Sequence, residues 1–341
     1  MLPKFVARGL NSGTTVMLIS FAPHSRFVPF PEAPDSAVPS YYGLAAMPAI
    51  DDRHFHYEPF RPEQPEGLET IEVIRPAEAC YRPRNEHAPA LVLIPGLGMD
   101  CRGYIRQFPL GALAEIHCPQ AANREIPGEA DLGHFARHVE EYILARELDK
   151  RPGGFVLGGS SMGGAVSLAI CARGRVCPRA LILLGSFAHR RHLPAYQRAL
   201  APLSYYLPID WAKRTINPFL SRFSRLGDMS GGEAMWLTNG RVRRTPSYYG
   251  RAIMALTKQD QLDNARRIGI PTLVLHGTND WVLPFAAGAE MAQTIPGARL
   301  VSIHGGGHGF FFTHPEPTNA AIASFLREVC NLPTTAPVPM P

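Results

Sequence analysis

Short runs of consecutive apolar residues recur along the chain, separated by segments whose apolar residues follow a helical period. Uninterrupted apolar runs bounded by Gly, Pro or polar residues are typical of strands buried on both faces. We expect such strands at residues 90–94, 113–118, 155–157, 180–184, 271–276 and 299–303. Helical spacing marks residues 132–148, 165–172, 285–294 and 316–329. Strands that alternate with helices predict an α/β fold with a mostly parallel sheet and helices on both faces.

Residues 69–74 alternate polar and apolar side chains like an edge strand, and we expect the ordered core to begin there. Residues 1–68 form a Pro-rich N-terminal extension, because their ten prolines remove backbone donors and break any long helix or central strand. This extension could wrap around the core or stay partly disordered. The predicted core covers residues 69–185 and 265–332, and a Pro-rich tail occupies 333–341.

A change of composition interrupts the α/β pattern between residues 186 and 264. Residues 186–260 hold twelve Lys or Arg against four Asp or Glu, together with many aromatic residues. A structureless loop of this length is improbable in a compact domain. Residues 186–264 are therefore predicted to be a mostly helical cap, inserted over one end of the sheet.

The turn between the strand at 155–157 and the following helix carries a serine flanked by glycines. Gly159 and Gly163 stand two residues on either side of Ser161, which is the spacing of a nucleophile elbow. In such an elbow the glycines let the strand and the helix approach closely around a strained serine. Taking Ser160 as the nucleophile would place Met162 where the second glycine belongs. Ser161 is therefore the predicted nucleophile.

A serine nucleophile needs a base, and the base needs an acid to orient it. Asp280 follows the strand at 271–276, and His308 lies in a glycine-rich turn after the strand at 299–303. Functional groups of open α/β sheets gather at the carboxyl ends of the strands. Asp280 and His308 are therefore the predicted acid and base. Three other histidines fit less well: His276 precedes a glycine turn, His304 ends a strand and His314 precedes a proline.

These motifs resemble the α/β-hydrolase superfamily over residues 69–330. The resemblance rests on the loop Pro95-Gly96-Leu97-Gly98, the Ser161 elbow, the turn that ends at Asp280 and the Gly307-His308 pair. It implies that the backbone N–H groups of Leu97 and Met162 form the oxyanion hole. Many members of the superfamily have His-Gly where this chain has Pro95-Gly96.

The combined motifs predict a serine hydrolase that cleaves a carboxylic ester or thioester through an acyl-enzyme, without a metal or organic cofactor. The resemblance also includes lactonases and hydrolases that cleave carbon–carbon bonds, and these remain alternatives. A non-catalytic member that keeps the fold to bind a ligand or partner is a second class of alternative. The basic residues of the cap are usually a solvated face, but they could instead guide an anionic substrate on CoA or an acyl carrier.

Composition narrows the remaining possibilities. The 341 residues are 45% hydrophobic and 18% charged, with a net charge of +5, and no basic run is interleaved with aromatic residues as on a nucleic-acid surface. No apolar run approaches the roughly 20 residues that span a bilayer. The six cysteines show no metal-binding spacing, and Asp51, Asp52, His54 and His56 are read as solvated surface. We expect a cytoplasmic protein with reduced thiols; a processed N-terminal signal is the alternative.

Overall fold

The computed structural model describes residues 55–59, 72–76, 88–99, 101–119, 131–205 and 246–332. All of them belong to one of the chain's two compact units, Val38–Pro341. The strands are β1 (Phe55–Pro59), β2 (Glu72–Pro76), β3 (Ala90–Ile94), β4 (Glu115–Cys118), β5 (Phe155–Ser160), β6 (Ala180–Leu184), β7 (Thr272–Gly277) and β8 (Arg299–Ile303).

The helices surround this sheet. The α-helices are α1 (Leu132–Ala145), α2 (Met162–Arg173), α3 (Ala195–Leu200), α6 (Pro246–Lys258), α7 (Leu262–Arg266), α8 (Phe285–Thr294), α9 (Phe310–Thr313) and α10 (Pro315–Val329). Four 3₁₀ helices accompany them: η2 (Cys101–Ala112), η3 (Leu148–Lys150), η4 (Arg190–His192) and η5 (Ala201–Tyr205). None of the described helices combines the length and the apolar character that a membrane span requires.

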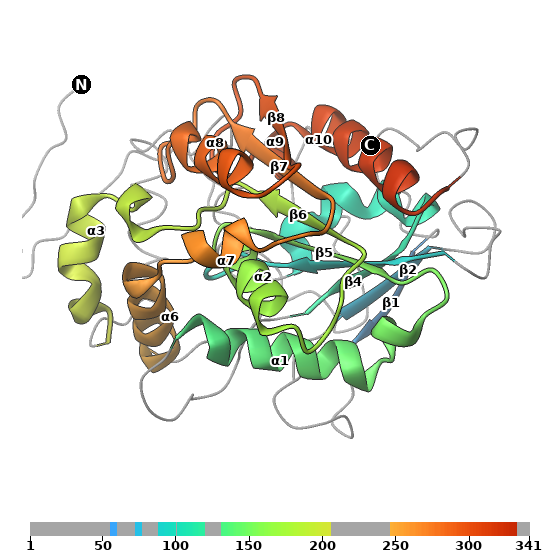
Figure 1. Cartoon of the computed structure of the whole chain (residues 1–341), viewed down its shortest axis with the longest axis horizontal. Coiled ribbons are helices and arrows are strands. Elements are labelled where there is room, and N and C mark those ends of the chain that lie inside the picture. The colour runs from blue at the N-terminus through green and yellow to red at the C-terminus, as the bar shows by residue number, and fades with distance from the viewer. Residues whose placement is uncertain are drawn as a thin grey trace, which may run out of the picture. The chain divides into compact units, whose positions relative to one another are not determined.

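The strands form a single sheet in the order β1-β2-β4-β3-β5-β6-β7-β8 (Figure 1). The six strands from β4 to β8 in this order are parallel, whereas β2 pairs antiparallel with both β4 and β1. The predicted α/β fold with a mostly parallel sheet is thus confirmed. Because the parallel strands share a direction, their carboxyl ends meet at one edge of the sheet.

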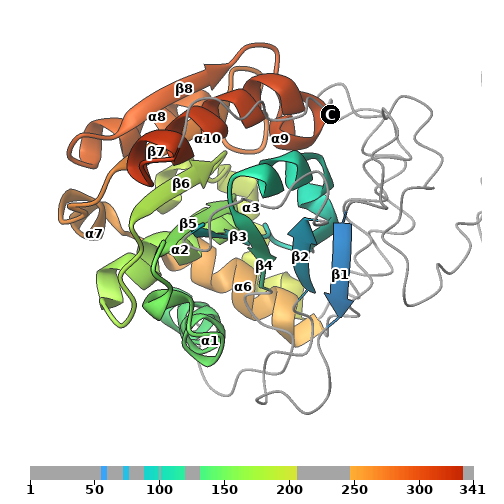
Figure 2. The ribbon, with the colours of Figure 1, turned by 90° about the vertical axis from the view of Figure 1, so that its right-hand side faces the viewer.

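Two hydrophobic layers explain why β3 and β6 are apolar at every position. All residues of β3 and β6 are fully buried. One layer packs the sheet against α1, α2, α7 and α8, and the other packs it against η2, α9 and α10. Figure 2 shows α1 and α2 on one side of the strands and α10 on the other. Strands covered on both faces need apolar side chains on both.

One strand precedes the point at which we expected the sheet to begin. β1 lies within the predicted extension and pairs with β2 over five residues, from Phe55 opposite Pro76 to Pro59 opposite Glu72. The sequence of β1 contains a proline and a glutamate, which weakens any strand signal. The remainder of residues 1–68 lies outside the described part of the chain.

The described part of the predicted cap is helical. It comprises η4, α3, η5 and α6, and α7 follows where the chain rejoins the core. The two connections form a hydrogen-bonded neck, which we call the cap root: residues 187–190 going out and 259–261 coming back. Within it Arg190 N–H donates to Gln259 O at 3.1 Å and Gln261 N–H donates to Ala188 O at 2.8 Å.

Candidate active site

The turn from β5 to α2 holds Ser161 in a strained backbone conformation. Ser161 has φ 52° and ψ −116°, a region that non-glycine residues rarely occupy. The strand β6 fixes this turn, since Ser161 N–H donates to Leu184 O at 2.9 Å and the Ser186 hydroxyl donates to Ser161 O at 2.7 Å. The surrounding structure therefore holds Ser161 in place at the carboxyl edge of the sheet.

The two glycines around Ser161 are required by close backbone approach. A Cβ atom on Gly163 would lie 2.0 Å from Ile94 O, and one on Gly159 would lie 2.3 Å from the carbonyl carbon of Gly163. No side chain fits into such spaces. This is the packing reason for the glycine spacing on which the elbow was predicted.

Ser160 and Ser161 differ in what surrounds them. Ser160 is 1% exposed, and its hydroxyl lies 3.0 Å from the hydroxyl of Tyr104. Successive side chains of a strand point to opposite faces, so Ser160 faces the same layer as Val156. Ser161 is partly exposed. The structure thus separates a buried, hydrogen-bonded serine from an accessible one.

The turns after β7 and β8 are joined by three hydrogen bonds, which bring Asp280 and His308 together. Thr278 N–H donates to Ile303 O at 3.0 Å, Asn279 N–H to Gly306 O at 2.9 Å, and Gly305 N–H to the Thr278 hydroxyl at 2.9 Å. As a result, His308 Nδ1 lies 2.8 Å from Asp280 Oδ2. A Cβ atom built on Gly185, next to Leu184, would lie 3.6 Å from both Asp280 Oδ2 and His308 O. Ser161, Asp280 and His308 therefore share one edge of the sheet.

The two carboxylate oxygens of Asp280 have separate partners. Oδ1 accepts from the N–H groups of Val282 and Leu283, both at 2.9 Å, and Oδ2 faces His308. Burial opposes ionisation of this fully enclosed carboxyl group, but the charge of His308 and these hydrogen bonds outweigh burial and hold the pKa of Asp280 below its usual range. Because an ionised carboxylate only accepts, His308 Nδ1 must carry the proton, which leaves Nε2 free to accept one.

His276 was set aside in the sequence because it precedes a glycine turn, yet it contacts the same carboxylate. Its Nε2 lies 3.0 Å from Leu283 O and 3.4 Å from Asp280 Oδ2, and its ring is fully buried. Both neighbours are acceptors, so Nε2 carries a proton. His276 therefore helps to hold the carboxylate of the predicted acid, Asp280, in place. The sequence signal for this contact was the position of His276 near the end of β7, four residues before Asp280.

The loop after β3 touches the elbow. A Cβ atom on Gly96 would lie 3.4 Å from the Cβ atom of Ser161 and 3.3 Å from Ser160 O. Met162 begins α2 and is buried. Among the described residues, no backbone acceptor takes the N–H of Leu97 or Met162. The two predicted oxyanion-hole donors are thus unpaired groups on adjoining segments.

The remaining histidine candidates lie elsewhere. His304 is exposed, and His314 Nδ1 contacts the hydroxyl of Thr313 at 2.8 Å. Within the described residues no group of three or more His, Cys, Asp or Glu is placed to hold a metal ion. Of the four residues weighed as a surface cluster, Asp51, Asp52 and His54 lie outside the described part, and only the backbone of His56 is described.

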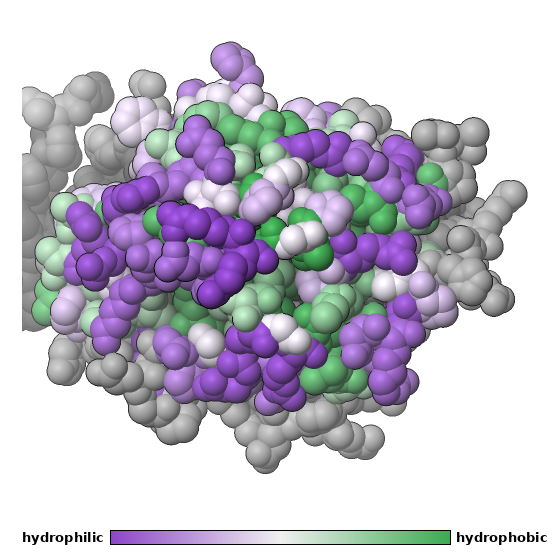
Figure 3. Space-filling model, in the orientation of Figure 1, coloured by the Kyte–Doolittle hydropathy of each residue, from purple (hydrophilic) through white to green (hydrophobic). Residues whose placement is uncertain are grey.

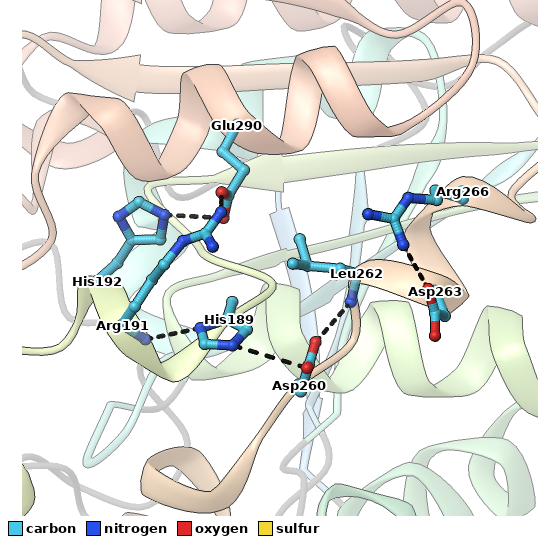
Figure 4. Close-up of polar contacts among 8 residues, drawn as sticks. All are labelled: His189, Arg191, His192, Asp260, Leu262, Asp263, Arg266 and Glu290. Atoms are coloured by element: carbon cyan, nitrogen blue, oxygen red, sulfur yellow. Dashed lines mark hydrogen bonds and ion pairs between the residues drawn. The ribbon is translucent and has the colours of Figure 1, made fainter.

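Charged side chains attach the beginning of the cap to the core. Arg191 and His192 both contact the carboxylate of Glu290 in α8, and His189 contacts Asp260 across the cap root (Figure 4). His192 Nε2 lies 2.8 Å from Glu290 Oε2. Figure 3 shows hydrophilic side chains gathered over the region between α3 and α7. These contacts join the described beginning of the predicted cap to α8.

A family model described as the alpha/beta hydrolase family matches residues 91–321. A pimeloyl-[acyl-carrier protein] methyl ester esterase of Aromatoleum aromaticum is 27% identical over 257 residues, covering 70% of this chain and 98% of the relative. A non-heme chloroperoxidase of Streptomyces lividans is 36% identical over 93 residues, covering 27% of this chain and 33% of the relative. The chain thus spans about a third of the chloroperoxidase.

A solved structure of a thermophilic esterase from Thermogutta terrifontis superposes with a TM-score of 0.59. The two chains are 23% identical, and the match covers 76% of this chain and 94% of the esterase. At this identity the structural similarity supports the fold alone.

Proposed function

Since the chain belongs to the alpha/beta hydrolase family, we propose that it is a serine hydrolase that cleaves carboxylic esters or thioesters with Ser161, His308 and Asp280. The observation that carries this proposal is the 2.8 Å contact between His308 Nδ1 and the buried carboxylate of Asp280. It lies at the same sheet edge as the strained turn of Ser161. Nothing in this chemistry requires a metal or an organic cofactor.

The proposed reaction begins with transfer of the Ser161 proton to His308 Nε2 as Ser161 Oγ attacks the carbonyl carbon. Asp280 holds Nδ1–H and stabilises the imidazolium that forms. His308 then returns the proton to the leaving alcohol or thiol, which departs and leaves an acyl-enzyme. Water, deprotonated by His308 in turn, attacks the acyl group and releases the acid with Ser161 restored.

The N–H groups of Leu97 and Met162 are proposed to bind the carbonyl oxygen as it gains negative charge. Fixed donors are most useful when charge develops in the transition state, because they need no reorganisation at that moment. Two features support this role: neither N–H has a backbone partner among the described residues, and the loop of Leu97 touches the elbow.

Ester hydrolysis is also supported by the relative from Aromatoleum aromaticum, an esterase matched over nearly its whole length. Lactonase and carbon–carbon bond hydrolase remain the alternatives within the family. A cytoplasmic location is part of the proposal and is supported by the free thiols of Cys118, Cys171, Cys177 and Cys330.

Labelling with a fluorophosphonate probe and assays on p-nitrophenyl esters, a lactone and a CoA thioester test the proposal. Wild type should be labelled at Ser161, whereas Ser161→Ala should lose both labelling and turnover while remaining folded. Ser302→Ala, at an exposed serine of β8, is the matched control and should behave like wild type. A folded wild type that is neither labelled nor active would favour the non-catalytic alternative, and turnover of the lactone alone would favour a lactonase.

The substrate is further proposed to carry an anionic group, such as CoA or the phosphopantetheine arm of an acyl carrier. An open depression of about 420 Å³ at the base of the cap is lined by Arg190, Ala195, Arg198, Ala199 and Thr257. Neither arginine side chain forms an ion pair within the described part of the chain. Two unpaired guanidinium groups beside a hollow are suited to bind phosphate.

Salt and charge variants test this substrate class. Arg190→Gln with Arg198→Gln should lower kcat/KM for a CoA thioester and reduce its salt dependence, while a neutral p-nitrophenyl ester should be little affected. Arg266→Gln, which removes an exposed arginine paired with Asp263, is the matched control. Equal salt dependence for both substrates would reject the anionic group. Arg241 and Arg243, also basic residues of the cap, lie outside the described residues.

A further inference from the structure

Tyr104 lies in η2 and is one of the largest fully buried side chains of the described core. It packs in the layer that η2, α9 and α10 form against the sheet. Its hydroxyl lies 2.8 Å from Ile94 O and 3.0 Å from the hydroxyl of Ser160. The mechanism proposed above uses neither Tyr104 nor Ser160, so this buried pair needs its own explanation.

The number of protons fixes the direction of these two hydrogen bonds. A phenol has one proton, and a backbone carbonyl can only accept. Burial raises the pKa of Tyr104, so the phenol keeps its proton at neutral pH. Tyr104 must therefore donate to Ile94 O, and the Ser160 hydroxyl must donate to Tyr104. The result is a chain of two hydrogen bonds, in which Ser160 donates to Tyr104 and Tyr104 donates to Ile94 O.

The two ends of this chain stand next to the two proposed oxyanion donors. Ile94 is the last residue of β3 and lies three residues before Leu97, while Ser160 is the last residue of β5 and lies two residues before Met162. We propose that Tyr104 is a positioning residue of the hydrolase site, which fixes the separation of the Leu97 and Met162 N–H groups by joining Ile94 to Ser160. This inference rests on the proposed function.

The ring of Tyr104 also connects this support to the segment of His308. Its centroid lies 5.4 Å from that of Phe311, three residues after His308. In the same helix, the side-chain amide of Gln107 donates to Phe311 O and lies 3.2 Å from Asn319 Oδ1 of α10. The helix η2 thus contacts the last residues of β3 and β5 and the segment after His308, all from the face of the sheet opposite α2.

Tyr104→Phe removes one oxygen and both hydrogen bonds while it keeps the ring. Small displacements of catalytic groups are costly, and a misplacement of 1 Å can lower the rate by about a hundredfold. The loss should appear in kcat with KM unchanged, because the oxyanion donors act mainly on the transition state. A boronic acid, which forms a tetrahedral adduct on serine, should lose affinity by the same factor as kcat/KM.

Tyr142→Phe is the matched control. Tyr142 is also fully buried, and its hydroxyl lies 2.7 Å from His117 Nδ1, but it packs in the layer on the opposite face of the sheet. The two variants should lower the unfolding midpoint by similar amounts. With rates corrected for active sites titrated by fluorophosphonate, Tyr104→Phe should lower kcat by at least about fivefold, and Tyr142→Phe should not. If Tyr104 had a purely structural role, Tyr104→Phe would lower the unfolding midpoint and leave kcat unchanged.

Ser160→Ala provides a second, smaller change. It removes the hydroxyl that donates to Tyr104 but leaves the bond from Tyr104 to Ile94 O, so it should cost less than Tyr104→Phe. In the Tyr104→Phe background, Ser160→Ala should lower kcat no further, because the hydrogen bonds through Tyr104 are already absent. If the effects of Ser160→Ala and Tyr104→Phe on kcat were fully additive, the two residues would not act through one hydrogen-bond chain.

A Tyr104→Phe enzyme with a smaller loss in kcat, or with a loss confined to KM, would overturn the positioning role and leave the proposed function intact. The wild type reports on the proposed function in the same assay. If its turnover does not depend on Ser161, the proposed function fails and the role of Tyr104 fails with it.

Discussion

Asp280 shows how a single carboxylate can serve the fold and the site together. Its Oδ1 closes the turn after β7 by accepting two backbone N–H groups, and its Oδ2 receives His308. The first oxygen fixes the plane of the carboxylate, so the second is aimed before any substrate arrives. Preorganisation of this kind avoids the cost of ordering the acid during the reaction.

Asp280→Asn should therefore preserve the turn and damage the chemistry. The amide oxygen can still accept from Val282 and Leu283, but the amide nitrogen would face His308 Nδ1 and donate to it. The imidazole proton would then move to Nε2, which could no longer accept from Ser161. We expect kcat to fall by about 10⁴ in a variant that still folds, with a lower unfolding midpoint because the buried carboxylate and its interactions with His308 and His276 are lost. A kcat close to that of wild type would place the acid elsewhere in the chain.

At the scale of elements, the site depends on how closely β3, β5 and α2 approach one another. The helix α2 can begin directly beside the end of β3 only because Gly163 has no side chain. Gly163→Ala would place a methyl group 2.0 Å from Ile94 O, and the backbone would have to move apart. We expect the free energy of unfolding to fall by about 3 kcal/mol or more.

Gly269→Ala is the matched control, because a Cβ atom there meets no atom within 4 Å. Urea unfolding of the two variants compares the same chemical change in a closed and an open space. If Gly163→Ala unfolds at the same urea concentration as Gly269→Ala, the approach of α2 to β3 is looser than described.

The anchor of the cap gives a second prediction at this scale. Glu290 is 16% exposed and joins Arg191 and His192 to α8, whereas the nearby pair of Asp263 and Arg266 is largely exposed. Glu290→Gln should lower the free energy of unfolding by about 1 kcal/mol, and Asp263→Asn by less than about 0.5 kcal/mol. Thermal unfolding of both variants tests this, and an equal effect would mean that the anchor contributes no more than a surface pair.

The elements differ in how well the sequence predicts them. The strands at 90–94 and 180–184 and the helix at 285–294 have the expected bounds, because their burial leaves a continuous or periodic apolar pattern. The strand at 299–303 also has the expected bounds, although only Ile303 in it is buried. No element was predicted from the sequence at the position of η2, which contains Pro109. Tyr104 was missed for that reason. Its role depends on contacts with residues 10 and 56 positions away.

Asp280 and His308 were expected from chain order and from strand ends, and the structure places them in contact. His276 was set aside as the base, which agrees with its fully buried position, but its contact with Asp280 was not predicted, because the sequence does not show which side chains meet at the end of a strand. β1 was missed because its pairing with β2 comes from backbone hydrogen bonds, which the side-chain pattern of a short strand does not reveal.

At the scale of the whole molecule, the partly buried Glu115 and the buried Asp280 and His117 make stability depend on pH. Burial opposes ionisation of Glu115, but hydrogen bonds and charges from His117 and Arg151 outweigh it and lower the pKa of Glu115. The pKa of Asp280 is lowered as described above. Burial also lowers the pKa of His117, against the opposing effect of Glu115. In each case the unfolded chain binds a proton more readily than the folded protein.

Stability should therefore decrease as the pH falls. The effect should begin near pH 6.5 with His117 and grow below about pH 4.3, where unfolded carboxyl groups take up protons. Urea unfolding at pH 7, 5.5 and 4 measures it. Glu115→Gln should flatten the acid part of the profile, while Asp263→Asn should keep the wild-type slope. A wild-type stability independent of pH would contradict the ionised state of Glu115 and Asp280 and the neutral state of His117.

The cap root has a consequence for how such a protein can diversify. The backbone leaves the core at Ala188 and returns at Gln261, and these two residues are hydrogen-bonded neighbours. Gln261 also donates from its side chain to Ala165 O, in the helix that begins at the elbow. The junction between core and predicted cap is thus held together by hydrogen bonds to core residues. If the predicted cap selects the substrate, an exchange of the segment between Ala188 and Gln261 should alter which substrate is accepted while the core keeps its hydrogen bonds at the junction.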